Sequence, residues 1–390
     1  MVNGRGDLAP TIADGFTKMS THPSLSADLS ATIEQIADHL RVDAASLQIT
    51  PVRHGRLERN NVWRLNTPET DYILKQHLIA HPVGKTAYSP YHIETAVLPI
   101  LHRAGCCVPQ VVWKSQVDSM LLLESCGENT LDDLAQASPA EILVPITRNA
   151  VREFCRLEMV FADRAKAIQP YIYTSDSPLD DTLDGILDRG RKTVEYLAWL
   201  NGGPIRPDEQ AIVDEVWEHM SNCLHNAEAR LGSLDYNARN VVVNGDSPAF
   251  IDFASVGWDW GERRLVQTFN SLGAHRSGGR FVCTLNREVV GEYASRTAQG
   301  KSDESEVRVD YHNILFYLSI IHRLLQAIAQ PQREASKSLL NAWGDAKPRL
   351  RQAIDLLADT PLSGNPYAAR LRSIVGEWRS AAAKSGDWQL

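Results

Sequence analysis

Three polar residues, Asp235, Asn240 and Asp252, have the types and the spacing that phosphoryl transfer requires. One carboxylate must orient the attacking hydroxyl and accept its proton, while an amide oxygen and a second carboxylate hold magnesium against the nucleotide phosphates. Asp235 and Asn240 are separated by one tight loop. Asn244-Gly245, a strong turn signal, then lies between two apolar runs. A hairpin here returns the chain so that Asp252 faces Asn240, and the sequence therefore predicts a shared magnesium site.

The segment 233–253 resembles the signature of the aminoglycoside phosphotransferase and choline kinase superfamily, which has the protein-kinase-like fold. In that family a loop H-x-D-x-x-x-x-N is followed by a β-hairpin and by a strand that ends in I-D-F. Here Asp235-x4-Asn240 and Ile251-Asp252-Phe253 stand at the matching spacing. The expected order of elements extends the resemblance over roughly residues 47–330, although only the segment 233–253 is specific.

The resemblance implies an α+β, bilobal protein-kinase-like fold. A small antiparallel β-sheet lobe with one main helix comes first, and a larger, mostly helical lobe carries the catalytic β-hairpin. Residues 1–24 are rich in small and polar residues, so we expect a frayed N-terminus there. We expect the nucleotide-binding lobe over residues 25–124 and the helical catalytic and substrate lobe over residues 125–390.

The resemblance also implies roles for individual residues. Asp235 is the expected catalytic base, and Asn240 and Asp252 are the expected magnesium ligands. Lys75 stands at the end of an apolar run, and its implied role is to bind the α- and β-phosphates of ATP. Glu94, on the helix that follows, is expected to pair with Lys75.

Two further segments are expected to contact the nucleotide. The phosphate-covering loop corresponds to residues 53–61, which contain one glycine, so a side chain from Asn60 or Asn61 is expected to serve there. Residues 121–127 resemble the hinge between the lobes, where the backbone of Glu124 and Cys126 can pair with adenine. The alternative for this segment is an ordinary strand end followed by a glycine turn.

The residues around the signature depart from the family pattern and leave the acceptor open. Ser233 stands where relatives have a histidine that supports the loop. Downstream, relatives often carry a G-D-P-x-x-D-L-A-like stretch; Asp259 corresponds to its first aspartate, while Arg263 and Arg264 stand near the second. Five residues in these regions are candidates for acceptor contacts: Tyr236, Asn237, Trp258, Asp259 and Trp260. Aromatic side chains there either bind the acceptor or pack in the interior.

Hydrophobic periodicity predicts the elements that must position these residues. Strands are expected near 47–52, 61–65, 71–77, 109–113 and 119–124. A helix over about 90–104 should end at Gly105, and Pro99 should kink or divide it. Further helices are predicted near 26–40, 140–160, 208–230 and 314–328, and two short strands near 241–243 and 249–252.

The composition excludes several classes of protein. The 390 residues are 43% hydrophobic and 23% charged, with a net charge of -8, which argues against broad nucleic-acid binding. The sequence contains neither a run of about 18 apolar residues nor the apolar core of a secretory signal. We therefore expect a cytoplasmic protein without membrane or nucleic-acid partners. An acidic run from Asp176 to Asp188 resembles the substrate loops of aminoglycoside-modifying relatives, and a solvated acidic face is the alternative.

These features together predict an ATP- and Mg²⁺-dependent phosphotransferase that acts on a hydroxyl of a small molecule. A sugar-like, aminoglycoside or other antibiotic acceptor ranks first. Three alternatives stay open. The chain could be a catalytically silent pseudokinase that serves as a binding module, a choline or amino-alcohol kinase, or an enzyme that transfers a nucleotidyl group and releases pyrophosphate.

Overall fold

The computed structural model describes residues 25–52, 60–79, 81–82, 87–173, 178–274, 278–297 and 301–384. The chain divides into two compact units. The first unit comprises Met1–Ala80 and Val111–Ser125, and the second comprises His81–Gln110 and Cys126–Leu390. The predicted lobe of residues 25–124 differs from the first unit, because residues 81–110 pack with the second.

The first unit is an antiparallel sheet packed on one helix. Its five strands, in the spatial order β1-β2-β3-β5-β4, are β1 (Gln48–Pro51), β2 (Asn60–Asn66), β3 (Asp71–His77), β5 (Met120–Glu124) and β4 (Val111–Ser115). Helix α1 (Leu25–Leu40) contributes Ile33 and Ile36 to a core with Leu74 and Leu122. The five strands lie where the periodicity predicted them.

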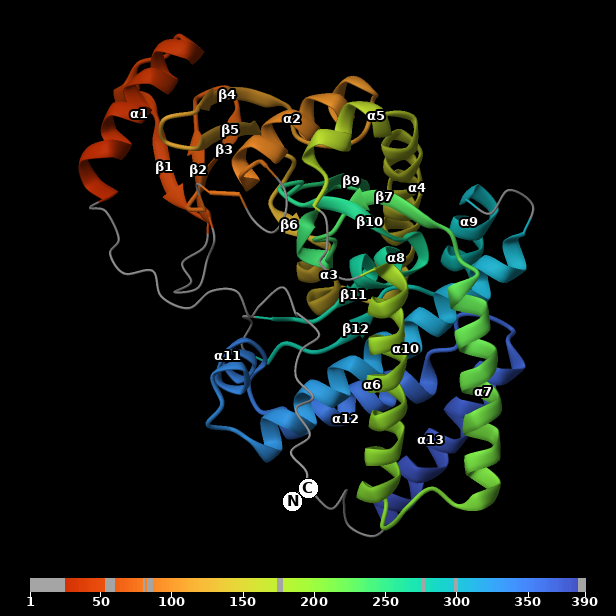
Figure 1. Cartoon of the computed structure of the whole chain (residues 1–390). Helices are drawn as coiled ribbons and strands as arrows, with labels where there is room; N and C mark the ends of the chain where they lie inside the picture. Colours follow the sequence, from red (N-terminus) through yellow and green to blue (C-terminus); the bar gives the residue numbers. More distant parts are fainter. Residues whose placement is uncertain are drawn as a thin grey trace, which may run out of the picture. The chain divides into compact units, whose positions relative to one another are not determined.

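The second unit consists mainly of helices (Figure 1). In chain order they are α2 (Pro90–Arg103), α3 (Leu131–Ala137), α4 (Ala140–Asp163), α5 (Ala165–Ile168), α6 (Leu179–Leu200), α7 (Pro207–His225), α8 (Gly261–Phe269), α9 (Arg287–Thr297), α10 (Ser302–Ala329), α11 (Glu334–Trp343), α12 (Ala346–Asp359) and α13 (Pro366–Lys384). A buried core joins α6, α7, α10, α12 and α13 through residues such as Leu197, Met220, Leu318 and Leu371.

Short strands of the second unit support the predicted site. Strands β7 (Ala229–Ser233) and β10 (Val256–Trp260) form an antiparallel ribbon in which Ser233 lies opposite Val256. Strands β6 (Asn129–Thr130), β8 (Val241–Asn244) and β9 (Ser247–Phe250) form a second sheet. Strands β11 (Asn270–Ser271) and β12 (Val282–Cys283) pair with each other. The predicted hairpin is confirmed as β8–β9, with Gly245 and Asp246 rather than Asn244 and Gly245 at its turn.

Helix α2 runs through Pro99 without dividing, so the predicted second segment does not form. A proline within a helix removes one hydrogen bond, and burial of the neighbouring apolar residues can outweigh that loss. Val97, Leu98 and Leu101 are fully buried on either side of Pro99. Gly105 follows the helix with a positive φ of 80°, as the sequence predicted for its end.

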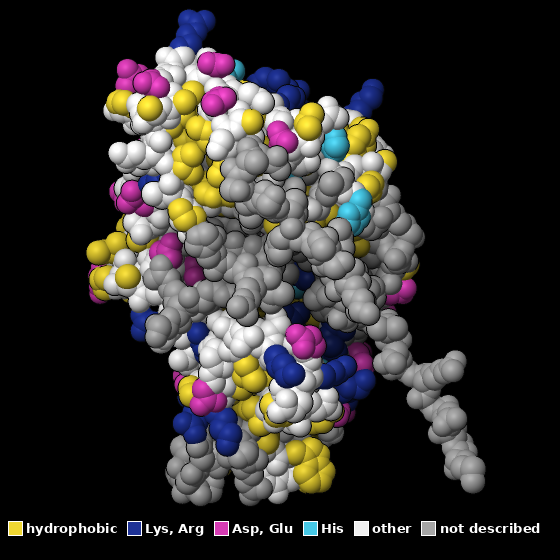
Figure 2. All heavy atoms as spheres, turned by 90° about the vertical axis from the view of Figure 1, so that its left-hand side faces the viewer, with side chains coloured by type: hydrophobic (Ala, Val, Ile, Leu, Met, Phe, Trp, Pro, Cys, Tyr) yellow, Lys and Arg dark blue, Asp and Glu magenta, His cyan; other side chains and the backbone are white. Residues whose placement is uncertain are grey.

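The surface of the described residues carries charges of both signs. Figure 2 shows acidic and basic side chains interspersed with hydrophobic ones on the face turned toward the viewer. Within the described ranges, no helix combines the length and the apolar character needed to cross a membrane.

Candidate active site

The β7–β10 ribbon leads directly into the predicted catalytic loop. Beyond the last rung of the ribbon, the Leu234 amide donates to the Ser255 carbonyl at 3.0 Å. Gly232, opposite Gly257 in the ribbon, has no room for a side chain. A Cβ there would lie 2.6 Å from Cζ of Arg264, so only glycine allows this arginine to pack against the strand. The loop therefore starts from a closely packed base.

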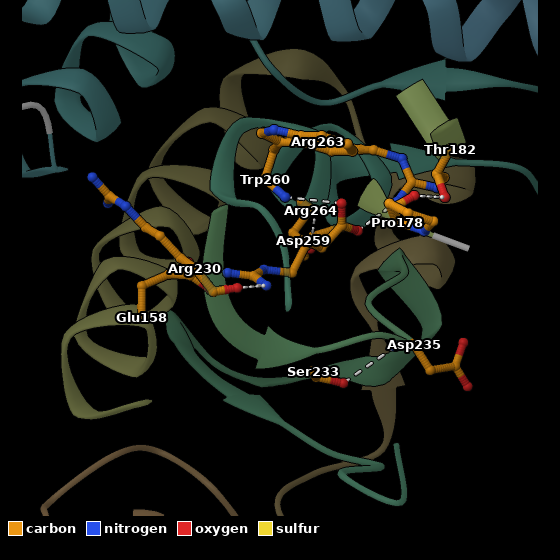
Figure 3. Close-up of polar contacts among 11 residues, drawn as sticks. Glu158, Pro178, Thr182, Arg230, Ser233, Asp235, Asp259, Trp260, Arg263 and Arg264 are labelled. Atoms are coloured by element: carbon orange, nitrogen blue, oxygen red, sulfur yellow. Dashed lines mark hydrogen bonds and ion pairs between the residues drawn. The ribbon is translucent and has the colours of Figure 1, made fainter. Parts of the chain in front are cut away.

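Asp235 is exposed at the start of this loop, and Ser233 lies beneath it. The Asp235 amide donates to Oγ of Ser233 at 3.3 Å, and Ser233 itself is 1% exposed. The serine thus supports the loop at the position where the family has a histidine. Figure 3 shows the Asp235 carboxylate pointing away from the β7–β10 ribbon.

Asn237 and Asn240 hold the loop in a short 3-10 turn, Ala238–Asn240. Oδ1 of Asn237 accepts from the Arg239 amide at 3.1 Å and caps this turn. Nδ2 of Asn237 lies 3.4 Å from Oδ1 of Asp235. Nδ2 of Asn240 donates to the Asp235 carbonyl at 2.8 Å. Asn237, predicted to contact the acceptor, therefore positions Asp235.

The β8–β9 hairpin brings the chain back to Asn240 next to Asp252. The Ile251 amide donates to the Asn240 carbonyl at 2.9 Å, so the residue before Asp252 is joined to Asn240. Asp252 has a φ of 66°, and Arg41 and Ser119 are the other non-glycine residues with positive φ in the part of the chain that the structure describes. Such a backbone costs on the order of 1–3 kcal/mol and concentrates at functional sites. The strain at Asp252 fits a carboxylate whose direction matters.

The residues present fit a magnesium ion. The hydrogen bond from Nδ2 of Asn240 fixes its amide and leaves Oδ1 as the atom that can ligate a metal. The Asp252 carboxylate supplies a second oxygen, and Mg²⁺ binds through one or two such ligands together with nucleotide phosphates and water. An amide oxygen and a carboxylate are therefore a suitable donor set.

A match to a protein-family model decides which family this is. Residues 48–294, more than half of the chain, match the model of the phosphotransferase enzyme family. The chain belongs to this family. The matched region includes the predicted catalytic loop, the β8–β9 hairpin and Asp252, so the sequence resemblance and the family match concern the same residues.

Solved structures similar to this family member include kinases with different acceptors. A choline/ethanolamine kinase family protein from Mesorhizobium loti is 15% identical, with 89% of this chain and 98% of that chain covered and a TM-score of 0.49. Choline kinase from Cryptosporidium parvum is 10% identical, with 92% and 97% covered and a TM-score of 0.48. The streptomycin–ATP–APH(2'')-IIa ternary complex is 13% identical, with 80% and 98% covered and a TM-score of 0.44. Sequence identities and TM-scores this low do not identify the acceptor of this chain. No curated protein matches the chain.

A buried ion pair packs against strand β7, which leads into the predicted catalytic loop. Nη2 of Arg264 donates to Oε2 of Glu158 at 2.6 Å, and Nη1 donates to the Arg230 carbonyl at 2.8 Å (Figure 3). Arg264 is fully buried and Glu158 nearly so. Burial raises the pKa of Glu158, and the Arg264 charge opposes this rise. Sequence reasoning missed this pair, although Glu158 follows Phe154 by one helical turn on the apolar face of α4.

Three of the candidate acceptor contacts require correction. Tyr236 is buried against Phe154 and Phe250, and Trp260 is buried near His312. Asp259 is also buried. Its oxygens accept from the Trp260 amide at 2.8 Å and from Nη1 of Arg263 at 2.5 Å. These side chains are packed or paired inside the unit and do not reach an acceptor. Trp258 is 49% exposed and remains a candidate.

The predicted nucleotide contacts are divided between the two units. Lys75, in the first unit, is buried on β3 between Val62 and Leu121 on the adjacent strands. Glu94, in the second unit, is fully buried on α2. Their ion pair stays a prediction.

The remaining nucleotide contacts were predicted at the phosphate loop and the hinge. Residues 53–59 of the phosphate loop lie outside the described residues. Asn60 pairs with His77 in the sheet, and Nδ2 of Asn61 donates to Oε1 of Gln76 at 2.9 Å. Glu124 ends β5 and Cys126 begins the next stretch of the second unit, so the chain passes between the units at the predicted hinge. The adenine contacts of these two residues stay predictions.

Proposed function

We propose that this chain is an ATP- and Mg²⁺-dependent phosphotransferase that phosphorylates a hydroxyl of a small molecule, with a sugar-like or antibiotic acceptor first. The observation that carries the proposal is the hydrogen-bonded set around Asp235. Asn237 and Asn240 bond to Asp235, and Asn240 bonds to the residue before Asp252. Membership of the phosphotransferase enzyme family supports the same reaction.

In the proposed reaction, the acceptor hydroxyl attacks the γ-phosphorus of ATP. A bond forms between the acceptor oxygen and phosphorus, while the bond to the β–γ bridging oxygen breaks and ADP leaves. The Asp235 carboxylate orients the hydroxyl and accepts its proton. Asn240 and Asp252 would hold magnesium, which when bound supplies positive charge against the β- and γ-phosphates. Lys75 would bind the nucleotide phosphates, and Glu94 would orient the Lys75 side chain.

The alternative that the chain is a catalytically silent binding module is based on the atypical residues of the loop 233–239. The hydrogen bonds of this loop argue against that alternative. Ser233 has no proton-transfer role in the proposed reaction. Its Oγ accepts the hydrogen bond from the Asp235 amide and so supports the loop. The substitution at this position therefore leaves the base in place. Choline-like alcohols are the alternative acceptors of the same phosphoryl transfer, and nucleotidyl transfer differs from phosphoryl transfer by its products.

An acceptor screen with product analysis tests the proposal. The wild-type protein would be incubated with Mg²⁺–ATP and with aminoglycosides, nucleoside antibiotics, amino sugars, sugar phosphates and choline, and the products followed by ³¹P NMR. The proposal predicts ADP and a phosphomonoester. Release of pyrophosphate would support nucleotidyl transfer instead, and the absence of turnover with every acceptor would support the binding module. An Asp246→Asn variant, altered in the exposed hairpin turn, is the matched control.

A further inference from the structure

Three arginines from three helices of the second unit form what we call the arginine cluster: Arg189 on α6, Arg263 on α8 and Arg323 on α10. Helix α10 packs against both α6 and α8. Arg263 is paired with Asp259. Within the described ranges, the side chains of Arg189 and Arg323 have no carboxylate partner. Arg189 is half-buried and Arg323 is exposed, so an anion from solution can reach both guanidinium groups.

The arginine cluster lies near the start of α6. Nη1 of Arg189 is 3.5 Å from the position that a Cβ on Gly185 would occupy, so this side chain extends back along α6 toward its N-terminal end. Figure 3 shows the Arg263 side chain reaching from α8 toward Thr182 and Pro178, at that same end of α6. The two guanidinium groups therefore approach one region from different elements.

Electrostatics indicate that positive charge in the cluster is not fully compensated. Burial lowers the pKa of Arg189, the neighbouring Asp188 opposes this, and the Arg263 charge lowers it further. Arg323 is exposed on α10, and partial desolvation first and then the Arg189 charge lower its pKa. The nearby His322 has its pKa lowered by burial first and then by the charge of Arg189. Like charges thus act on one another across α6 and α10.

The acidic residues of α6 do not neutralise the cluster. Asp180, Asp181, Asp184 and Asp188 are all exposed. Asp188 binds Nζ of Lys192 at 2.6 Å, and Asp184 lies 3.1 Å from Nε2 of His225. The described part of the acidic run is thus exposed to solvent, while Asp176 lies outside the described residues, and the choice between a substrate loop and a solvated face stays a prediction.

The residue that holds Arg263 lies on the same ribbon that leads to Asp235. Asp259, which holds Arg263, lies three rungs along the β7–β10 ribbon from Ser233, about 10 Å at the rise of a strand. Figure 3 shows the Arg263 guanidinium near Thr182 and the Asp235 carboxylate beyond the end of the ribbon. An acceptor of sugar size could place a hydroxyl at Asp235 and an anionic group at the arginines.

We propose that the arginine cluster binds an anionic group of the acceptor, so that the acceptor is a hydroxyl compound that already carries a phosphate or a carboxylate. This inference rests on the proposed function and narrows it. Guanidinium groups suit both anions because they form paired, charge-assisted hydrogen bonds with them. Aminoglycosides and choline carry the opposite charge and would be repelled.

Binding measured without turnover separates this inference from the proposed function. The nucleotide site would first be saturated with Mg²⁺ and a non-hydrolysable ATP analogue, so that added anions cannot bind there. Glucose 6-phosphate, gluconate, neutral glucose and cationic kanamycin would then be titrated calorimetrically. The proteins are the wild type, the Arg189→Gln/Arg323→Gln double variant, Asp235→Asn, and Arg191→Gln. Arg191 is the matched control, because it lies on α6 and pairs with Asp214 instead of joining the cluster.

The proposal predicts that glucose 6-phosphate or gluconate binds at least about tenfold more tightly than glucose, and the stronger of the two identifies the anion. The double variant should lose that advantage, while Arg191→Gln and Asp235→Asn should keep it. The proposal is overturned if neither anion binds better than glucose, if the double variant binds them as the wild type does, or if kanamycin binds best. Because Asp235→Asn is tested for binding alone, the anion-binding result can be interpreted even if the protein does not catalyse phosphoryl transfer.

Discussion

Asp252 combines a reactive side chain with a strained backbone. Its φ of 66° lies in the left-handed region, which asparagine and aspartate tolerate better than other non-glycine residues. Asp235, in contrast, is oriented by hydrogen bonds from the side chains of Asn237 and Asn240. At the scale of single residues, a strained backbone therefore positions Asp252, and side-chain hydrogen bonds position Asp235.

The backbone of Asp252 allows its charge to be tested separately from its conformation. Asp252→Asn keeps a residue that tolerates positive φ, so stability should change by less than about 1 kcal/mol. The loss of the carboxylate should raise the Mg²⁺ concentration needed for half-maximal nucleotide binding by about tenfold or more. Magnesium titrations at fixed ATP measure this. An unchanged magnesium requirement would show that Asp252 is not a magnesium ligand. Asp246→Asn is the control for the loss of one negative charge.

Gly232 offers a residue-scale test of the packing beneath the loop. In Gly232→Ala, the new Cβ must displace the buried Arg264, which is bonded to Glu158. Overpacking and the disturbed ion pair should lower the free energy of unfolding by roughly 2–4 kcal/mol. Urea denaturation measures the loss. Gly203→Ala, where nothing lies within 4 Å of the added Cβ, should change stability far less. Equal effects of the two substitutions would contradict this account of the ribbon.

At the scale of elements, the site depends on short pieces joined by few hydrogen bonds. The 3-10 turn Ala238–Asn240 is capped by Asn237, and the β8–β9 hairpin returns the chain to Asn240. The ribbon β7–β10 holds the start of the loop. None of these pieces would be stable alone, so each depends on its packing against α4 and α8.

The cap of the 3-10 turn can be removed without touching a reactive residue. Asn237→Ala deletes the acceptor of the Arg239 amide and the contact with Oδ1 of Asp235. We expect a loss of about 1 kcal/mol in stability and a fall in kcat, while the Kd for Mg²⁺–ATP stays close to that of the wild type. Steady-state kinetics and nucleotide titration separate these effects. A change confined to the Kd for ATP would place Asn237 at the nucleotide instead.

At the scale of the whole molecule, one buried histidine should make stability depend on pH. Burial lowers the pKa of His312 from 6.5 to about 3, and the charges of Arg263 and Arg308 add to the effect. Between these values the unfolded chain binds a proton that the folded chain does not. Stability should therefore fall as pH decreases from about 6.5, by up to about 1.4 kcal/mol per pH unit from this residue.

The His312→Gln variant should lose that part of the pH dependence. The measurement is the free energy of unfolding between pH 7 and pH 4, compared with the wild type and with a variant of the exposed His39. An identical slope in the wild type and in His312→Gln would show that His312 does not stay neutral in the folded state.

Local sequence patterns were sufficient to predict the local arrangement of the candidate site residues and insufficient for what supports them. Asp235, Asn240 and Asp252 lie within one short segment, so their spacing and the intervening turn predicted their arrangement. The β7–β10 ribbon was missed because the helix predicted over 208–230 ran into β7, whereas α7 ends at His225, and because the pairing joins distant segments. The Glu158–Arg264 pair joins residues 106 positions apart, and only the three-dimensional structure brings them together. The arginine cluster is likewise distributed over three helices.

The central claim is that Asp235 is the base of a phosphoryl-transfer site, and the turnover of Asp235→Asn tests it most directly. With an acceptor found in the screen, kcat should fall by about 10²–10⁴-fold, which is the usual contribution of a positioned base. The Kd for Mg²⁺–ATP should stay near the wild-type value, and Asp246→Asn should turn over normally. An Asp235→Asn variant that transfers phosphate at the wild-type rate would contradict the account.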